Sequence, residues 1–346
     1  MKRRARTSIA VAAALAITGS LAALPSGGDS PRAPAQRAVH ALLPEAHAEE
    51  PARRSPPPAQ PPASSPSPLS PLNERADAHL VRSWRAPLAG GLLTFPPSFS
   101  SEDGRYDLVI HLNGNTDLVE ESYGYAGVNA VVMILNLGVG SGVYEDRFAV
   151  DGSFDLILDR VQSVLTERGL RSPRLGRVAV SGWSSGYGGV IKLLQRDSVF
   201  DRIDAVLLFD SIHCGVDVWT GKRKPDQIEP IQRFARKAAA GRALLSITHS
   251  DIETHGYLDA HKTTDVVLAS VGVHRTRAAQ PQPMPALRSM IGVMPKAKML
   301  PLPPLTEAHQ GGLHVRGYSG NGPITHMLHL VQMSTTALPD LVARWR

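Results

Sequence analysis

Residues 178–190 read VAVSGWSSGYGGV, and the expected fold is built outward from this stretch. An apolar strand is expected over residues 177–180, followed by the turn GWSSG and an amphipathic helix over residues 189–196. A strand, a sharp turn and a helix around G-x-S-x-G are typical of a nucleophile elbow, which holds a serine hydroxyl exposed on a strained turn. The glycines of the motif leave room for that turn. The stretch therefore predicts Ser184 as a nucleophile.

Apolar runs and helical periodicity alternate along the rest of the chain. One or two opening strands are expected within residues 84–95, and helical spacing with Gly169 as a stop predicts a helix over residues 153–168. The glycine-rich segment 138–147 is expected to be a loop that lines a substrate cleft, and the proline-interrupted segment 281–304 to be irregular. Further strands are expected over residues 105–112, 128–137, 203–209, 242–248 and 313–318, and further helices over 227–240, 257–270 and 326–342. This alternation predicts an α/β fold with a doubly wound, mostly parallel sheet.

The order of these parts resembles the α/β-hydrolase family over residues 80–346, with the elbow as its most specific motif. The resemblance implies a serine nucleophile, an acid and a histidine base in that chain order, and it implies no cofactor. Little or no cap domain is expected, because residues 173–241 leave no room for a large lid. Residues 216–225, with Trp219, form at most a small flap.

The base should lie in the loop after the last strand, where the resemblance points to His326, with His329 as the fallback. A serine hydroxyl needs such a base to take its proton and return it to the leaving group. The acid is narrowly expected to be Asp251, which follows the strand before the penultimate helix, over Asp210, with Glu253 third.

Two backbone N–H groups would stabilise the oxyanion. The first belongs to Ser185, directly after the nucleophile, and the second to Asn115 or else Gly114, in the glycine-bearing turn after strand 105–112. The expected reaction is the cleavage of an ester or amide of a small molecule or peptide through an acyl-enzyme. A carboxylic ester is favoured over a peptide.

Two further classes of function remain open. His249, Asp251 and His255, with His261 beyond, would place imidazoles and a carboxylate at a strand end, as a metal-assisted hydrolase requires. The spacing matches no motif such as H-E-x-x-H. The third class is a non-catalytic binding protein on the hydrolase fold.

The beginning of the sequence departs from globular composition. A basic start followed by SIAVAAALAITGSLAAL predicts a signal peptide or membrane anchor over residues 1–24. Residues 25–75 are expected to be a proline-rich disordered linker, and residues 76–346 the α/β-hydrolase domain. Cys214 is the sole cysteine, so an intrachain disulfide is excluded. We expect a bacterial protein exported to the periplasm or the medium, or tethered to the inner membrane by its leader.

The basic net charge comes mostly from this N-terminal part. Residues 1–75 hold nine Lys and Arg against five Asp and Glu, an excess of +4 out of the total of +6. The rest is nearly neutral and has no basic stripe with interleaved aromatic residues, so no nucleic-acid partner is expected. Nothing in the sequence indicates the oligomeric state or the particular acyl substrate.

Overall fold

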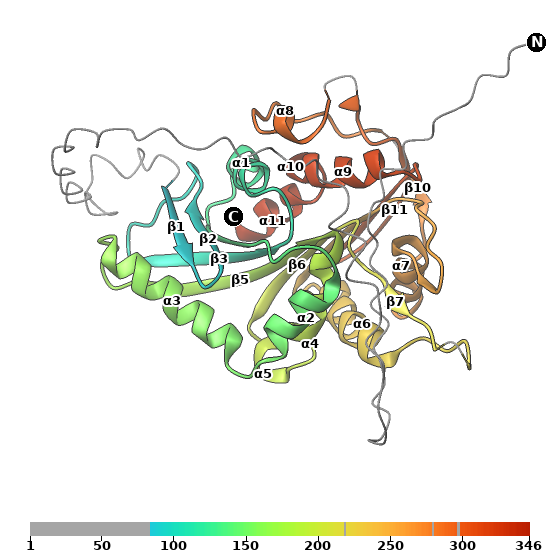
Figure 1. Cartoon of the computed structure of the whole chain (residues 1–346), viewed down its shortest axis with the longest axis horizontal. Coiled ribbons are helices and arrows are strands. Elements are labelled where there is room, and N and C mark those ends of the chain that lie inside the picture. The colour runs from blue at the N-terminus through green and yellow to red at the C-terminus, as the bar shows by residue number, and fades with distance from the viewer. Residues whose placement is uncertain (1–83, 218, 279, 296–297) are drawn as a thin grey trace, which may run out of the picture. The chain divides into compact units, whose positions relative to one another are not determined.

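A ten-stranded sheet forms the centre of the computed structural model, which describes residues 84–217, 219–278, 280–295 and 298–346 (Figure 1). The expected leader over residues 1–24 and linker over residues 25–75 lie outside the described residues and stay predictions. Within the described ranges, no helix has the length and apolar character needed to span a membrane.

The central strands of this sheet are parallel and its margins are antiparallel. Across the sheet the strands are β1 (Trp84–Leu88), β2 (Gly91–Phe95), β4 (Val131–Leu135), β3 (Arg105–Leu112), β5 (Arg174–Trp183), β6 (Ile203–Phe209), β8 (Leu244–His249), β12 (Leu313–Tyr318), β11 (Pro304–Gln310) and β10 (Thr276–Arg277). Neighbouring strands from β4 to β12 are parallel, and the two pairings at each edge of the sheet are antiparallel. A separate ribbon pairs β7 (Cys214–Gly215) with β9 (Tyr257–Leu258).

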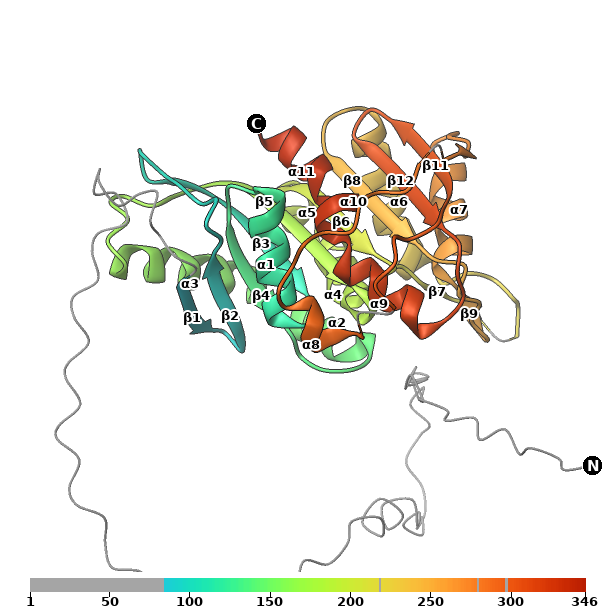
Figure 2. The same cartoon turned by 90° about the horizontal axis from the view of Figure 1, so that it is seen from above.

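Helices cover both faces of the sheet, as Figures 1 and 2 show. One apolar core lies between the sheet and α2 (Ser141–Ala149), α3 (Ser153–Glu167), α4 (Tyr187–Leu194), α5 (Asp197–Phe200), α6 (Pro225–Ala239) and α7 (Ala260–Ala269). The other lies between the sheet and α1 (Thr116–Ala126), α8 (Met290–Val293), α9 (Pro323–Val331), α10 (Met333–Thr336) and α11 (Leu338–Trp345). Burial on both faces explains the continuous apolar runs of the central strands. The expected α/β fold with a mostly parallel sheet is confirmed.

Three of the expected strands, β3, β6 and β12, have the bounds that the apolar runs predict. The expected loop over residues 138–147 is wrong, because most of it belongs to α2. Tyr144 and Phe148 lie four residues apart on one face of this helix, and both are buried against the core. The segment between β6 and α6 contains β7 and a short hairpin closed by a bridge between Val216 and Arg223, and no helical cap among its described residues.

The single closing helix expected over residues 326–342 is also wrong, since the structure has α9, α10 and α11 in its place. Pro339 lies in the first turn of α11, where its missing N–H is tolerated. Within a continuous helix, its ring would clash with the carbonyl four residues earlier. The longest elements that were not expected are α1, which Asn115 caps, and β11, which joins β12 through Gly311 and Gly312. The short helix α8 also forms within segment 281–304, which was expected to be irregular.

Candidate active site

Ser184 stands on a strained turn at the end of β5. Its φ of 52° lies in the left-handed region that a side chain rarely adopts, and the 3-10 turn Ser184–Gly186 leads directly into α4. A Cβ on Gly186 would collide with the carbonyl oxygen of Leu112, the last residue of β3. Only glycine at position 186 lets the elbow pass this close to the neighbouring strand.

Two further glycines bring the start of α4 against its surroundings. A Cβ on Gly188 would lie 2.7 Å from the carbonyl oxygen of Ser141, and one on Gly189 would lie 2.7 Å from Leu112 Cδ1. The first N–H groups of a helix have no partner within the helix. The backbone N–H of Ser185 therefore lies at a helix start that is packed closely and fixed in place.

His326 and Asp210 form a hydrogen-bonded pair. His326 Nδ1 lies 2.7 Å from Asp210 Oδ2, and Asp210 is buried directly after β6. Ser250 donates its backbone N–H and its hydroxyl to Asp210 Oδ1, at 2.8 and 2.9 Å. A carboxylate accepts the Nδ1–H of His326, which leaves Nε2 of a neutral ring with a free lone pair.

Asp210 is held in its ionised form. Burial by itself would raise the pKa of this carboxyl. The nearby His329 and His326 rings and the Ser250 N–H outweigh burial, and they place the pKa well below its usual range. The negative charge needed to stabilise a protonated His326 is thus already present at the end of β6.

The sheet and Trp183 link the strand that precedes Ser184 to the histidine–aspartate pair. Strands β5 and β6 are parallel neighbours, and the Ser211 hydroxyl donates to the Ser184 carbonyl at 2.7 Å. The Trp183 ring stacks on His326 with 4.7 Å between centroids, and its Nε1–H donates to the His326 carbonyl at 3.0 Å. Among the described residues the Ser184 hydroxyl takes part in no hydrogen bond, so it makes none to His326 in this structure.

The loop after β3 is tied to the elbow by Asn113, a residue that sequence analysis did not single out. Asn113 has a φ of 68°, and its side-chain amide donates to Trp183 O and Ser185 Oγ, each at 3.1 Å. An asparagine directly before a glycine was the only sequence signal for this conformation. The loop thereby lies beside the N–H of Ser185.

The two residues expected to supply the second oxyanion donor lie in this loop. The Asn115 side chain caps α1 by accepting from Leu118 N at 3.0 Å, which fixes the residue at the helix start and leaves its backbone N–H for an oxyanion. The Gly114 carbonyl accepts from Asn136 Nδ2 at 2.9 Å, and Gly114 is buried whereas Asn115 is exposed. Accessibility favours the Asn115 N–H.

The preference for Asp251 as the partner of His326 is corrected by the structure, which places Asp210 there. Asp251 Oδ1 lies 3.1 Å from Nδ1 of His261 instead, and its backbone N–H donates to Gly320. The reason is the strand order. Asp210 ends β6, next to the strand that carries Ser184, whereas Asp251 follows the more distant β8.

The second candidate base, His329, and the third candidate acid, Glu253, do not take part in this pair. His329 is buried, its Nδ1 lies 2.9 Å from Thr248 Oγ1, and burial lowers its pKa to about 4. Glu253 is exposed in the loop after β8. His329 therefore packs in the core and does not replace His326 beside Asp210.

The histidines after β8 form a different cluster from the expected one. Ligand atoms of His249, Asp251 and His261 lie within 4.8 Å of one another, while His255 is exposed and outside the cluster. Arg275 NH1 lies 2.8 Å from His249 Nε2 and donates to it. The other ring nitrogen of His249, Nδ1, lies 3.1 Å from the Ser250 carbonyl oxygen. Burial, and next the charge of Arg275, lower the pKa of His249 to about 3.

This arrangement does not suit a metal ion. A guanidinium occupies the lone pair of His249 that a metal would need, and its positive charge would repel a cation. These contacts instead keep His249 neutral and hydrogen-bonded to Arg275.

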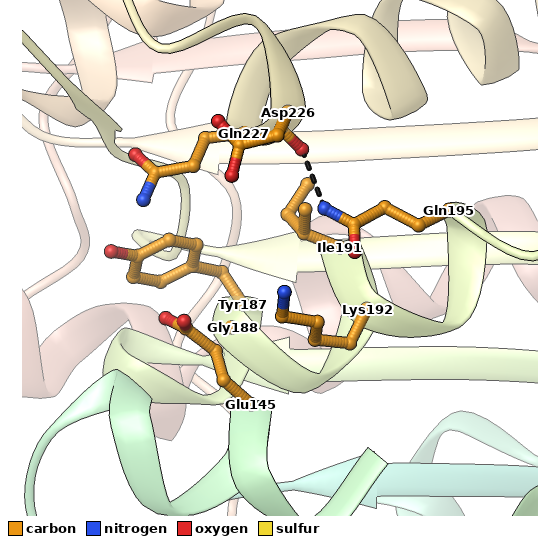
Figure 3. Close-up of a pocket in the computed structure, with 8 residues that line it drawn as sticks. All are labelled: Glu145, Tyr187, Gly188, Ile191, Lys192, Gln195, Asp226 and Gln227. Atoms are coloured by element: carbon orange, nitrogen blue, oxygen red, sulfur yellow. Dashed lines mark hydrogen bonds between the residues drawn. The ribbon is translucent and has the colours of Figure 1, made fainter. Parts of the chain in front are cut away.

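Two surface hollows lie apart from these residues. Figure 3 shows the first, of about 260 Å³ and open to solvent, between α2, α4 and α6. Glu145, Tyr187 and Lys192 are among its lining residues, and Gln195 Nε2 donates to the Asp226 carbonyl at its rim. The second, of about 950 Å³ and open to solvent, lies beside the hairpin 216–223. The nucleophile candidate and its partners line neither hollow.

No model of a known protein family matches the chain, and no curated protein matches it significantly.

Proposed function

We propose that the protein is a serine hydrolase that cleaves carboxylic esters through an acyl-enzyme. One observation carries the proposal. Ser184 is held at a positive φ on a strand-to-helix turn, and the Trp183 that precedes it stacks on His326, whose Nδ1 is bonded to a buried, ionised aspartate. Strained turns of this kind are retained where a side chain has a chemical role.

The proposed reaction assigns one task to each group. His326 Nε2 accepts the Ser184 hydroxyl proton as Oγ attacks the substrate carbonyl, and Asp210 stabilises the resulting imidazolium. The N–H groups of Ser185 and Asn115 donate to the oxyanion. His326 then protonates the leaving alcohol, and the acyl-enzyme forms. Water, deprotonated by the same histidine, attacks the acyl carbon; the bond to Ser184 Oγ then breaks, His326 returns the proton to Oγ, and the acid is released.

The substrate class is inferred from how open the site is. No helical cap lies between β6 and α6 in the described chain, and His326 keeps 26% of its side-chain surface exposed. An uncovered site of this kind fits accessible small acyl esters, with peptides as the second class. Export of the enzyme by its leader remains a prediction from the sequence.

Covalent labelling tests the proposal. Protein comprising residues 72–346 is treated with a fluorophosphonate probe beside Ser184→Ala, Ser185→Ala and Ser163→Ala. We expect wild type and Ser163→Ala to label equally, because Ser163 lies on the exposed side of α3. Ser185→Ala should still label, since it keeps its backbone N–H, and Ser184→Ala should not.

Two results would overturn the proposal. Undiminished labelling of folded Ser184→Ala would assign the reactivity to another residue. Absence of both labelling and ester hydrolysis in folded wild type would favour a binding protein.

A further inference from the structure

Three buried polar side chains meet behind the loop that follows β3. His111 Nδ1 lies 2.7 Å from Ser181 Oγ and 3.2 Å from Tyr123 OH, and the two hydroxyls are 2.7 Å apart. The three residues come from β3, α1 and β5, and His111 and Ser181 are register partners in the sheet. The histidine and the serine are fully buried, as is the tyrosine. The catalytic steps proposed above use none of them.

The hydrogen bonds fix the tautomer of His111. Its Nε2 lies 2.9 Å from the Asn113 carbonyl oxygen, which only accepts, so the proton is on Nε2. Nδ1 then accepts a hydroxyl proton from Ser181 or Tyr123. Burial lowers the pKa of His111 to about 4, so the ring is neutral near pH 7.

The bond from His111 determines how the loop backbone is turned. The Asn113 carbonyl and the Gly114 N–H belong to one planar trans peptide and point in opposite directions. Because the carbonyl points at His111, the N–H of Gly114 points away from it. The next peptide is held in the same manner, since the Gly114 carbonyl accepts from Asn136. The Asn136 bond sets the direction of the Asn115 N–H, and the His111 bond sets the peptide directly before it.

We propose that His111 is a positioning residue for the oxyanion donors. Braced by Ser181 and Tyr123, it holds the peptide plane between residues 113 and 114 in a fixed relation to β5, and the donor peptide between residues 114 and 115 continues from that plane. This inference rests on the proposed serine hydrolase function and deepens it.

A positioning role has a kinetic signature. Donors aimed at the oxyanion act in the transition state more than on the bound ester, so their misalignment lowers kcat and leaves KM nearly unchanged. Removing one oxyanion donor outright costs roughly 10²-fold in kcat in other enzymes. Loosening a donor should cost less, about 10- to 100-fold.

The experiment compares His111→Leu with His111→Gln, whose amide can still donate to the Asn113 carbonyl. The stability control is Val161→Ala, a core truncation in α3 away from the loop. The readouts are kcat and KM for a p-nitrophenyl ester per active site titrated with fluorophosphonate. We expect about a 10- to 100-fold lower kcat with a KM within about twofold for His111→Leu, and recovery of most of kcat in His111→Gln. Val161→Ala should lower Tm and leave kcat unchanged.

The inference fails if folded His111→Leu keeps the wild-type kcat per titrated site, or if His111→Gln is as impaired as His111→Leu. If neither His111 variant folds, Tyr123→Phe replaces them, because it removes one of the two hydroxyls that bond His111. We expect it to lower kcat severalfold. An unchanged kcat would contradict the inference. Failure of the proposed function has a different signature, because Ser184→Ala would then keep the wild-type activity.

Discussion

His326 Nδ1 lies 2.7 Å from Oδ2 of Asp210, a residue 116 positions earlier in the chain. The bond joins the end of β6 to the first turns of α9. It connects the carboxylate that the sheet places beside the elbow to the imidazole that stacks on Trp183. The pair couples the orientation of the ring to the position of the nucleophile strand.

Replacing Asp210 by asparagine should abolish most of the ester hydrolysis. The amide cannot stabilise an imidazolium, and its NH₂ group favours the wrong tautomer of His326, so we expect kcat to fall by about 10³-fold or more. Asp251→Asn is the matched control, since Asp251 contacts His261 instead, and its kcat should stay within about threefold of wild type. A larger loss in the control than in Asp210→Asn would reverse the assignment of the acid.

Gly186→Ala should prevent stable folding of the elbow. The added Cβ would collide with the Leu112 carbonyl oxygen, a backbone atom of β3 that cannot move aside as the end of a flexible side chain could. We expect a loss of at least about 3 kcal/mol in the free energy of unfolding, measured by urea titration. Gly142→Ala in α2 adds the same atom in open space and should be neutral or slightly stabilising. Equal stability of the two variants would contradict the packing described for the elbow.

Asp340→Ala should be strongly destabilising. Its carboxylate binds Arg316 through two bonds of 2.7 and 2.8 Å and also accepts from the Ser246 hydroxyl. Removing it leaves a largely buried guanidinium without its partner, at a cost of about 3–5 kcal/mol. Asp155→Ala breaks an exposed pair with Arg202 and should cost less than about 1 kcal/mol. Chemical denaturation of both variants measures the difference, and similar losses would contradict the burial argument.

Stability should fall between pH 6.5 and about 4. Burial lowers the pKa values of His111 and His329 to about 4 and that of His249 to about 3, whereas the unfolded chain binds these protons below about pH 6.5. The unfolded state therefore gains protons first as the pH falls, and each histidine lowers the free energy of unfolding by up to about 3 kcal/mol. The contribution of Asp210, whose pKa is depressed, is lost only at still lower pH.

Urea unfolding at several pH values measures this dependence. His111→Gln should reduce its slope by the share of one histidine. A flat profile from pH 7 to 4 would show that the buried rings are not held neutral.

Chelation should leave the activity unchanged. Arg275 holds the lone pair of His249 that a metal would use, so treatment with EDTA should not alter kcat, and added zinc should not stabilise the protein against heat. Arg275→Ala frees that nitrogen beside Asp251 and His261, and this variant alone should gain thermal stability from zinc. Loss of wild-type activity on chelation, restored by zinc, would favour a metal-assisted hydrolase.

The sheet was predictable because its strands are buried on both faces. Continuous apolar runs mark β3, β6 and β12, and the amphipathic periodicity of residues 153–168 marks α3. The helices α1 and α2 contain glycine, tyrosine and acidic residues, so their apolar faces are hard to see without the sheet against which they pack. The strand β11 exists through its pairing with β12, a tertiary contact that leaves little trace in local composition.

The site could be predicted only as far as its motif and chain order extend. Ser184 follows from the elbow, and His326 from its place after the last central strand. The choice between Asp210 and Asp251 depends on which strand lies beside β5, and the chain order does not give that spatial order. The roles of Asn113 and His111 depend on hydrogen bonds to β5, which sequence spacing does not reveal.

The positive φ angles of Ser184 and Asp210, 52° and 45°, also bear on how this protein would respond to artificial selection. Both residues follow adjacent parallel strands, but only Ser184 could become glycine without loss, because Asp210 accepts buried hydrogen bonds from Ser250 and is bonded to His326. Glycine would relieve the strain at position 184 by about 1 kcal/mol. A library screened only for heat resistance should therefore accumulate glycine at position 184, and its most robust survivors would lack the proposed ester hydrolysis. A screen that also demands ester hydrolysis would have to find its added robustness elsewhere in the chain.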